Sequence, residues 1–304
     1  MNFSVNILGC GSATPTARHL PSSQVINFRE QLMMIDCGEG AQRQYRMMKL
    51  KFSRLNHIFI SHLHGDHFFG LPGLLSTLAL HEIGGTIVVH TFADGVEYLR
   101  RTMAMFCSDT SFNIEYDIIT PEHRVILDTK ALTVETFPLH HRVPTVGFIF
   151  REKPKPRHIR PDMIEFHQVP VAQINAIREG ADFLRPDGRL IPNAHLTTDA
   201  DPAMSYAYCS DTAYHPQIAE YLQGVHTIYH ESTYLQDNAH KAAPRGHSTA
   251  AEAGKIATAA GAKRLILGHY SQAYNDDQLF AAEAATTFNG EIIAATEGLT
   301  INLL

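Results

Sequence analysis

The feature that most constrains this chain is a run of potential metal ligands that directly follows an apolar segment. Residues 57–60 (His-Ile-Phe-Ile) predict a buried strand, and residues 61–67 read Ser-His-Leu-His-Gly-Asp-His. Side chains alternate along an extended segment, so His62 and His64 are expected to point the same way. These two histidines can therefore share one cation.

The other two ligand-type residues, Asp66 and His67, follow the tight turn that Gly65 permits. They stand at the start of a predicted helix, residues 71–80, and are expected to face a second metal position beside the first. Histidine nitrogens and carboxylate oxygens suit zinc best, followed by manganese or iron. A lone histidine is usually an ordinary surface or core residue, but four ligand-type residues in this order after a strand predict a metal site.

Further ligand-type residues stand near the ends of predicted strands. Two adjacent divalent cations need a shared anion to offset their repulsion, and Asp211 is the best-placed carboxylate. His140 and His141 are adjacent candidates, and side-chain alternation predicts that one of them faces the site. His269 would complete the second metal position, although a single distal histidine is as often a core residue as a ligand. Asp36 either accepts a hydrogen bond from a ligand histidine or forms an Asx turn or helix cap.

Predicted strands and helices alternate, then strands cluster, and the alternation resumes near Tyr206, which favours an α/β fold of sheet layers with helices outside. The strands are expected at residues 5–8, 25–28, 32–35, 57–60, 86–90, 114–119, 125–127, 132–137, 146–151, 206–209, 227–229 and 265–267. The helices are expected at residues 41–48, 71–80, 96–105 and 250–260.

Residues 153–198 differ from the rest of the chain. The segment opens with a stretch rich in proline and basic residues, carries turn signals at residues 186–188 and at Pro192, and has room for a short helix. Long connections of this kind are usually functional or mobile. We predict an insertion that projects from a core formed by residues 1–152 and 199–304.

Composition restricts the class of protein. With 304 residues, 44% of them hydrophobic, the chain can bury a large core. The first residues lack the pattern of an export signal, no run approaches the length of a membrane span, and the four cysteines lack CxxC spacing. We therefore expect reduced cysteines, a cytoplasmic location and no membrane partner.

The formal net charge of −6 disfavours a general nucleic-acid binder, because such proteins usually carry a basic face. Two stretches, residues 43–54 and 151–160, are nonetheless basic. A charged stretch is usually a solvated face, and only a polyanionic substrate would give these two another role.

Taken together, the motifs of the chain resemble those of the metallo-β-lactamase-like hydrolases and, among them, of the ribonuclease Z family, the tRNA 3′-processing endonucleases. The motifs that carry the resemblance are LGCGSATPTARHLPSS, DCGEGAQRQ, SHLHGDHFFGLPGLL, HRVP at His141, SDT at Asp211, HEST at His230 and GHSTAAEAG at His247. They cover essentially the whole chain outside the insertion. The resemblance implies an αββα sandwich with an inserted flexible arm.

The resemblance also implies a metal content and its ligands. It implies two Zn²⁺ ions per subunit, with Mn²⁺ or Fe²⁺ as alternatives, and the family's HxxP pattern selects His141 over His140. One ion would be held by His62, His64 and His141, the other by Asp66, His67 and His269, and Asp211 would bridge the two.

The implied activity is that of a zinc-dependent endoribonuclease. A hydroxide between the metals would attack the phosphodiester and remove the 3′ trailer of precursor tRNA, which leaves a 3′-hydroxyl on the tRNA. Asp66 would orient or deprotonate the attacking water, and His247, working with Glu231, would donate a proton to the departing 3′ oxygen. Ser248 and Thr249, at a predicted helix N-terminus, would bind a phosphate.

The implied partners are precursor tRNA and a second copy of the chain, and no DNA. In the family the inserted arm is an exosite that grips the tRNA elbow, and the arm of one subunit serves the active site of the other. This chain departs from the family pattern at residues 169–184, where the glycine- and proline-rich stretch of bacterial arms is not evident.

Two other classes of function fit parts of the sequence. A hydrolase of the same fold acting on small thioesters or phosphodiesters would use the same ligands, but it would need neither the arm nor the basic stretch at residues 43–54. A non-catalytic RNA-binding protein with this fold commonly lacks ligands, whereas here all seven ligand positions and His247 are filled.

Overall fold

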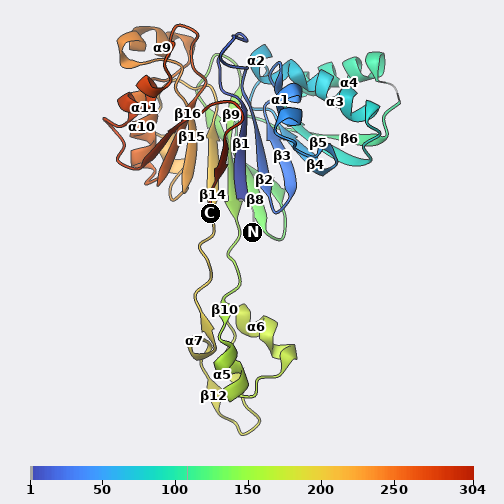
Figure 1. Ribbon diagram of the computed structural model, residues 1–304, viewed down its shortest axis with the longest axis vertical. Coiled ribbons are helices and arrows are strands. Elements are labelled where there is room, and N and C mark those ends of the chain that lie inside the picture. The colour runs from blue at the N-terminus through green and yellow to red at the C-terminus, as the bar shows by residue number, and fades with distance from the viewer. Residues whose placement is uncertain (1–2, 108) are drawn as a thin grey trace. The chain divides into compact units, whose positions relative to one another are not determined.

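The computed structural model describes residues 3–107 and 109–304, and the chain divides into two compact units (Figure 1). The larger unit contains the chain up to Asp128, Thr133–Phe150 and Met204–Leu304. The smaller unit contains Thr129–Leu132 and Arg151–Ala203. The predicted segment 1–152 begins with two residues that lie outside the described part of the chain.

Two seven-stranded sheets form the centre of the larger unit. In the first sheet the early strands pair antiparallel and the later ones pair parallel, so the metal motif follows a parallel strand, β4. The strand order is β18 (Thr300–Asn302), β1 (Phe3–Gly9), β2 (Ser23–Phe28), β3 (Gln31–Ile35), β4 (Leu55–Phe59), β5 (Gly85–Thr91) and β6 (Phe112–Ile118).

The second sheet joins four parallel strands from the C-terminal part of the chain to three strands from its middle. The strand order is β17 (Glu291–Ala294), β16 (Arg264–Gly268), β15 (Thr227–Glu231), β14 (Ser205–Cys209), β9 (Thr145–Glu152), β8 (Leu132–Leu139) and β7 (Arg124–Asp128). Parallel strands end at the same edge of a sheet, so the polar residues that follow β14, β15 and β16 lie close together.

Helices cover the outer face of each sheet, which confirms the predicted αββα sandwich; Figure 1 shows α1, α3 and α4 beside the first sheet and α10 and α11 beside the second. In α3 the apolar residues recur every three or four positions and are buried against that sheet. The helices are α1 (Ala41–Met47), α2 (Gly65–Phe68), α3 (Gly70–Leu80), α4 (Ala93–Phe106), α8 (Ile218–Tyr221), α9 (Ala239–Arg245), α10 (Ala250–Ala259) and α11 (Gln278–Ala284), with 3-10 turns at Phe52–Arg54 and Gln236–Asn238.

The structure differs from the sequence-based prediction in its short elements. Asp66 and His67 lie in α2, a separate turn of helix, rather than at the start of α3. The helices α8, α9 and α11 and the edge strands β17 and β18 were not predicted, because elements this short carry too few residues for a periodic pattern. In the described part of the chain, no helix combines the length and the apolar character needed to cross a bilayer.

The smaller unit has an apolar cluster of its own, formed by Val169, Ile177, Phe183, Ile191 and Leu196. Two short antiparallel pairs frame this cluster, β10 with β13 and β11 with β12. The elements are β10 (His158–Ile159), α5 (Pro161–Phe166), the 3-10 turn Val171–Gln173, α6 (Ile174–Arg178), β11 (Phe183–Leu184), β12 (Leu190–Ile191), α7 (Asn193–Leu196) and β13 (Thr197–Thr198). The predicted boundaries at 153 and 198 and the exosite role stay predictions.

Candidate metal centre

Three histidines and one carboxylate form a first group of potential ligands. Nδ1 of His64 lies 3.0 Å from Nε2 of His62 and 3.2 Å from Nε2 of His141. Oδ2 of Asp211 lies 3.7 Å from Nε2 of His62 and 3.7 Å from Nε2 of His141. Nitrogen and oxygen ligands about 2.0–2.2 Å from a tetrahedral zinc are roughly 3.3–3.6 Å apart. The four atoms are therefore spaced to surround one ion.

A second group consists of Asp66, His67 and His269. The Nε2 atoms of His67 and His269 are 3.3 Å apart, and each lies 3.5 Å from Oδ2 of Asp66. Asp211 reaches this group with its other oxygen, because Oδ1 is 3.3 Å from Nε2 of His67 and 3.1 Å from Nε2 of His269. Asp211 is only 2% exposed, and its Oδ1 has no hydrogen-bond partner among the described residues. This placement suits a carboxylate that bridges two cations.

The electrostatics of the two groups favour bound cations. Burial lowers the pKa of His62 well below its ordinary value, and the neighbouring His67 lowers it further. Burial opposes a charge on His67 too, but Asp211, Asp66 and Asp36 raise the pKa of this histidine well above its ordinary value. The carboxylates thus favour positive charge at the centre, which a metal ion supplies. The donor set, imidazole with carboxylate, fits Zn²⁺ and similar borderline ions.

Asp36, directly after β3, orients His67. Its Oδ2 accepts hydrogen bonds from Nδ1 of His67 at 2.7 Å and from the Tyr208 hydroxyl at 2.8 Å, and its Oδ1 accepts from the backbone N–H of Ser61 at 2.7 Å. Two roles were considered for Asp36. These contacts favour the first, in which Asp36 accepts a hydrogen bond from a ligand-type histidine. Nε2 of His67 is therefore left to face the centre.

Two more histidines are oriented through their second ring nitrogen. Nδ1 of His141 donates to the carbonyl oxygen of Gly246 at 2.7 Å, and Nδ1 of His269 lies 2.8 Å from the Thr233 hydroxyl. A Cβ at position 246 would lie 2.6 Å from Nδ1 of His141, so only glycine allows this approach. His140 instead stacks on the ring of His215, and of the adjacent pair only His141 joins the ligand group.

His247 and Glu231 lie beside the ligand groups. Nδ1 of His247 donates to Oε1 of Glu231 at 3.1 Å and lies 3.9 Å from Oδ2 of Asp211. Burial alone would lower the pKa of His247, but the Glu231 carboxylate outweighs it and raises this pKa to about 9. A histidine held in its charged form at the edge of a metal site can act as a proton donor.

Ser248 and Thr249 are both buried and are absent from the cavity wall. The N–H of Ser248 donates to Glu231, and its hydroxyl donates to the carbonyl oxygen of Thr212. Thr249 forms a capping box with Glu252 at the start of α10. Because these contacts occupy their polar groups, the predicted binding of phosphate by Ser248 and Thr249 does not fit the structure.

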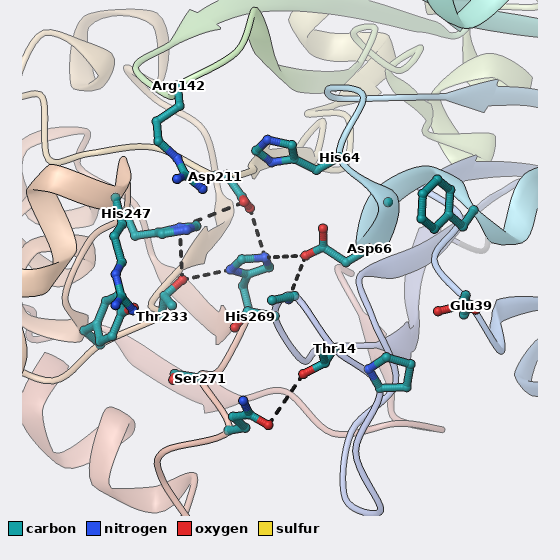
Figure 2. A pocket seen from close by; sticks show the side chains of 18 residues that line it. Thr14, Glu39, His64, Asp66, Arg142, Asp211, Thr233, His247, His269 and Ser271 are labelled. Carbon is teal, nitrogen blue, oxygen red and sulfur yellow. Dashed lines mark hydrogen bonds and ion pairs between the residues drawn. The ribbon is translucent and has the colours of Figure 1, made fainter. Parts of the chain in front are cut away.

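A cavity of about 690 Å³ contains the centre, and Figure 2 shows its wall. Arg142, which was not predicted, points from this wall toward Asp211. Among the described residues its guanidinium has no hydrogen-bond or ion-pair partner. The sequence signal for Arg142 is its position directly after the candidate ligand His141.

Two further groups at the centre were also missed. The Thr233 hydroxyl lies 2.8 Å from Oε2 of Glu231, 3.2 Å from Nδ1 of His247 and 2.8 Å from Nδ1 of His269. The backbone N–H of Ala13 donates to Oδ2 of Asp66 at 2.8 Å. Thr233 stands in the HEST motif beside Glu231, whereas a backbone N–H leaves no trace in a sequence.

Known structures share the fold of the chain. Human tRNase Z, short form, matches with a TM-score of 0.72 and 24% identity, and the match covers 99% of this chain and 99% of that one. The metallo-β-lactamase fold protein YhfI from Bacillus subtilis matches with a TM-score of 0.68 and 17% identity, covering 99% of this chain and 100% of that one. Both show that the sandwich is a metallo-β-lactamase fold.

Sequence comparisons narrow the family. Residues 3–155 match the family model described as anti-Pycsar protein Apyc1. The ribonuclease Z of Porphyromonas gingivalis is 50% identical over 303 residues, which cover 99% of each chain. The ribonuclease Z of Parabacteroides distasonis is 47% identical over 303 residues, again with 99% of each chain covered. With this identity along almost its entire length, the chain belongs to the ribonuclease Z family.

Proposed function

We propose that this protein removes the 3′ trailer of precursor tRNA by cutting one phosphodiester bond, which leaves a 3′-hydroxyl on the tRNA. As a member of the ribonuclease Z family, the chain is a metal-dependent endoribonuclease. The observation that carries the proposal is that two ligand groups, joined by Asp211, share one cavity with His247 and Arg142. The similarity to human tRNase Z, short form, supports tRNA as the RNA.

The seven clustered side chains would hold two Zn²⁺ ions, and Mn²⁺ or Fe²⁺ accept the same donors. One ion would be bound by His62, His64 and His141, the other by Asp66, His67 and His269, with Asp211 between them. When bound, the cations would activate a water molecule as the nucleophile and stabilise the negative charge that develops on the phosphoryl group.

Asp66 would orient the attacking water. Burial alone would raise its pKa, but the neighbouring His67 and a hydrogen bond with His269 hold this pKa below the usual range, so the carboxylate stays ionised and can accept a hydrogen bond from the water. The N–H of Ala13 fixes its Oδ2. The carboxylate is thus held in one place by groups from three parts of the chain.

His247 would protonate the departing 3′ oxygen. Glu231 acts on it as a positioning residue, because this carboxylate is buried and stabilises the charged imidazole from behind. Glu231 is itself held by the backbone N–H groups of Thr233 at 2.8 Å and Ser248 at 2.9 Å. These bonds leave the carboxylate no freedom to move away from the histidine.

Arg142 would contact a non-bridging oxygen of the scissile phosphate. Its unpaired guanidinium faces the cavity (Figure 2), and arginine forms strong, charge-assisted hydrogen bonds with phosphate. This role replaces the one that the sequence suggested for Ser248 and Thr249.

The smaller unit would serve as the tRNA-binding arm. Residues 151–203 contain eight Lys and Arg and eight Asp and Glu. Several of these charges pair with one another, as Arg157 does with Asp199 at 2.9 Å and Lys155 with Glu152 at 3.2 Å. Attraction by net charge therefore contributes little, and the unit would recognise the shape of the RNA.

We also propose that the protein acts as a homodimer. Apolar side chains on α3 and α4 are exposed, namely Leu80, Tyr98, Met105 and Phe106, and a second copy would cover such a surface. A homodimer would allow the arm of one copy to serve the active site of the other.

Purified, metal-loaded protein is expected to cut a 3′-extended precursor tRNA once, just after the discriminator base. Asp211→Ala removes the carboxylate shared by both ligand groups, so bound metal and cleavage should both be lost. Mass spectrometry of the metals and mapping of the RNA ends test this, with Glu291→Ala at the exposed edge strand β17 as the control. Turnover of a small phosphodiester or thioester without any cut in the precursor would contradict the proposed substrate.

His247→Ala should retain both metals and lower kcat roughly 10²- to 10⁴-fold, because it removes the proton donor and no proposed ligand. His140→Ala, which changes a histidine that stacks outside the ligand groups, is the matched control and should cleave like the parent. Metal content and single-turnover rates separate the two roles. Loss of a metal from the His247 variant would identify His247 as a ligand, since it lies near both Asp211 and His269.

Arg142→Ala should lower kcat/KM for the precursor by roughly 10- to 100-fold, the range for loss of a hydrogen bond to a charged group. Arg142→Lys should recover part of this loss, because it restores the charge without the forked geometry. Arg54→Ala, at an exposed arginine that pairs with Glu30, controls for the change in net charge. Equal kcat/KM for Arg142→Ala and the parent would exclude a phosphate contact by Arg142.

Replacing residues 158–198 with a short flexible linker should raise KM for the precursor while hydrolysis of bis(p-nitrophenyl) phosphate continues. The junction is favourable because His158 and Thr198, the two ends of the replaced segment, lie opposite each other in the antiparallel pair of β10 and β13. Circular dichroism and metal content check that the sandwich remains folded. A parallel loss of both activities would mean that the smaller unit is needed for the core rather than for the RNA.

A further inference from the structure

A second hollow of about 750 Å³ lies next to the metal cavity. Glu39 and Phe69 belong to the walls of both, so the two hollows meet at these residues. Its volume lies within the range of pockets that take small-molecule ligands, roughly 300–1,000 Å³. A substrate strand bound at the metal centre therefore has room to continue into this second hollow.

An exposed aromatic ring stands at the junction. Phe69 directly follows α2 and is 62% exposed. Its ring lies against Gly65, where a Cβ would be only 2.3 Å from the ring atom Cε2. Glycine at position 65 thus lets the ring lie over the backbone of the metal motif, which holds one side of the ring while much of the rest is open to solvent.

Two arginines belong to the wall of the hollow. Arg43 and Arg46 are three residues apart on α1, so they project on the same side of the helix, and both are exposed. Neither has a hydrogen-bond or ion-pair partner among the described residues. Arg54, in the same basic stretch of the sequence, is paired with Glu30. Of these basic residues, Arg43 and Arg46 are therefore unpaired and line the hollow, whereas Arg54 forms a surface ion pair.

We propose that this hollow binds the single-stranded 3′ trailer of the RNA, with Phe69 stacked on a base and Arg43 and Arg46 in contact with backbone phosphates. The inference rests on the proposed function. A basic groove with an aromatic platform is the usual combination for binding single strands, because every base has a face to stack. Paired bases inside a duplex expose no such face to a side chain.

The direction of the RNA follows from the position of the proton donor. His247 would protonate the departing 3′ oxygen, which belongs to the tRNA, so the tRNA end lies on the His247 side. Figure 2 shows Glu39 on the opposite side of the cavity from His247, with Asp66 and His269 between them. The phosphate that stays on the trailer is therefore free to lead the following nucleotides toward Glu39 and Phe69.

Glu39 restricts how the trailer can be oriented at the junction of the two hollows. It is exposed at the junction, and its carboxylate repels a phosphate placed directly over it. The same carboxylate accepts hydrogen bonds from a base amino group or a 2′-hydroxyl. The trailer would therefore cross the junction with a base and its sugar toward Glu39 and its phosphates toward Arg43 and Arg46.

The test uses one tRNA body with two unstructured 3′ extensions, a single nucleotide and about eight nucleotides, and the full-length, metal-loaded protein. Phe69→Ala should raise KM for the long extension at least about fivefold more than for the short one, as expected for a lost stacking contact. Phe69→Trp keeps the stacking face and should restore the preference. Leu279→Ala, at an exposed apolar residue of α11 that lines neither hollow, is the control.

Salt dependence gives a second readout. Arg43→Ala with Arg46→Ala should flatten the plot of log affinity against log salt for the long extension by about 0.7 per lost phosphate contact. Lys51→Ala, from the same basic stretch but outside the hollow, should leave the slope as in the parent. If the parent cuts both precursors and the Phe69 and arginine variants affect both extensions equally, this inference is overturned and the proposed function stands. A parent that cuts neither precursor overturns the proposed function and the inference with it.

Discussion

The metal centre depends on one buried carboxylate that lies between two groups of imidazoles. One oxygen of Asp211 faces His62 and His141, and the other faces His67 and His269. Burying an unpaired carboxylate costs several kcal/mol, so this position is stable only when positive charge surrounds it. Two neighbouring cations in turn repel each other unless an anion lies between them. The rest of the fold must therefore bring the two groups to the same point.

The sandwich brings the two groups together because strands of both sheets end beside the metal centre. The metal motif follows β4 in the first sheet, while Asp211 and His269 follow β14 and β16 in the second. The hydroxyl of Tyr208 on β14 donates to Asp36 after β3, so a buried hydrogen bond joins the sheets directly behind the centre. Sliding one sheet against the other would break this bond and separate the ligand groups.

The sequence predicted best what is local or periodic. The αββα layers follow from strand and helix patterns, and the metal motif lies within seven consecutive residues, 61–67. Contacts between distant segments were harder to foresee. Ser248 and Thr249 have the composition of a phosphate-binding helix start, but Glu231 and Glu252 occupy their N–H groups. The N–H of Ala13 belongs to no pattern, and the place of Arg142 beside His141 does not show which side chains the fold puts opposite it.

The order of the ligands along the chain has a consequence for synthesis. The candidate ligands in the first half of the chain end at His141, whereas Asp211, His247 and His269 all come after the smaller unit. A ribosome releases the chain from its N-terminus, so His62, His64 and His141 emerge well before Asp211 and His247. An interrupted translation product that ends before Asp211 therefore has no complete centre. The proposed activity can therefore begin only after the segment that carries Asp211 has been made.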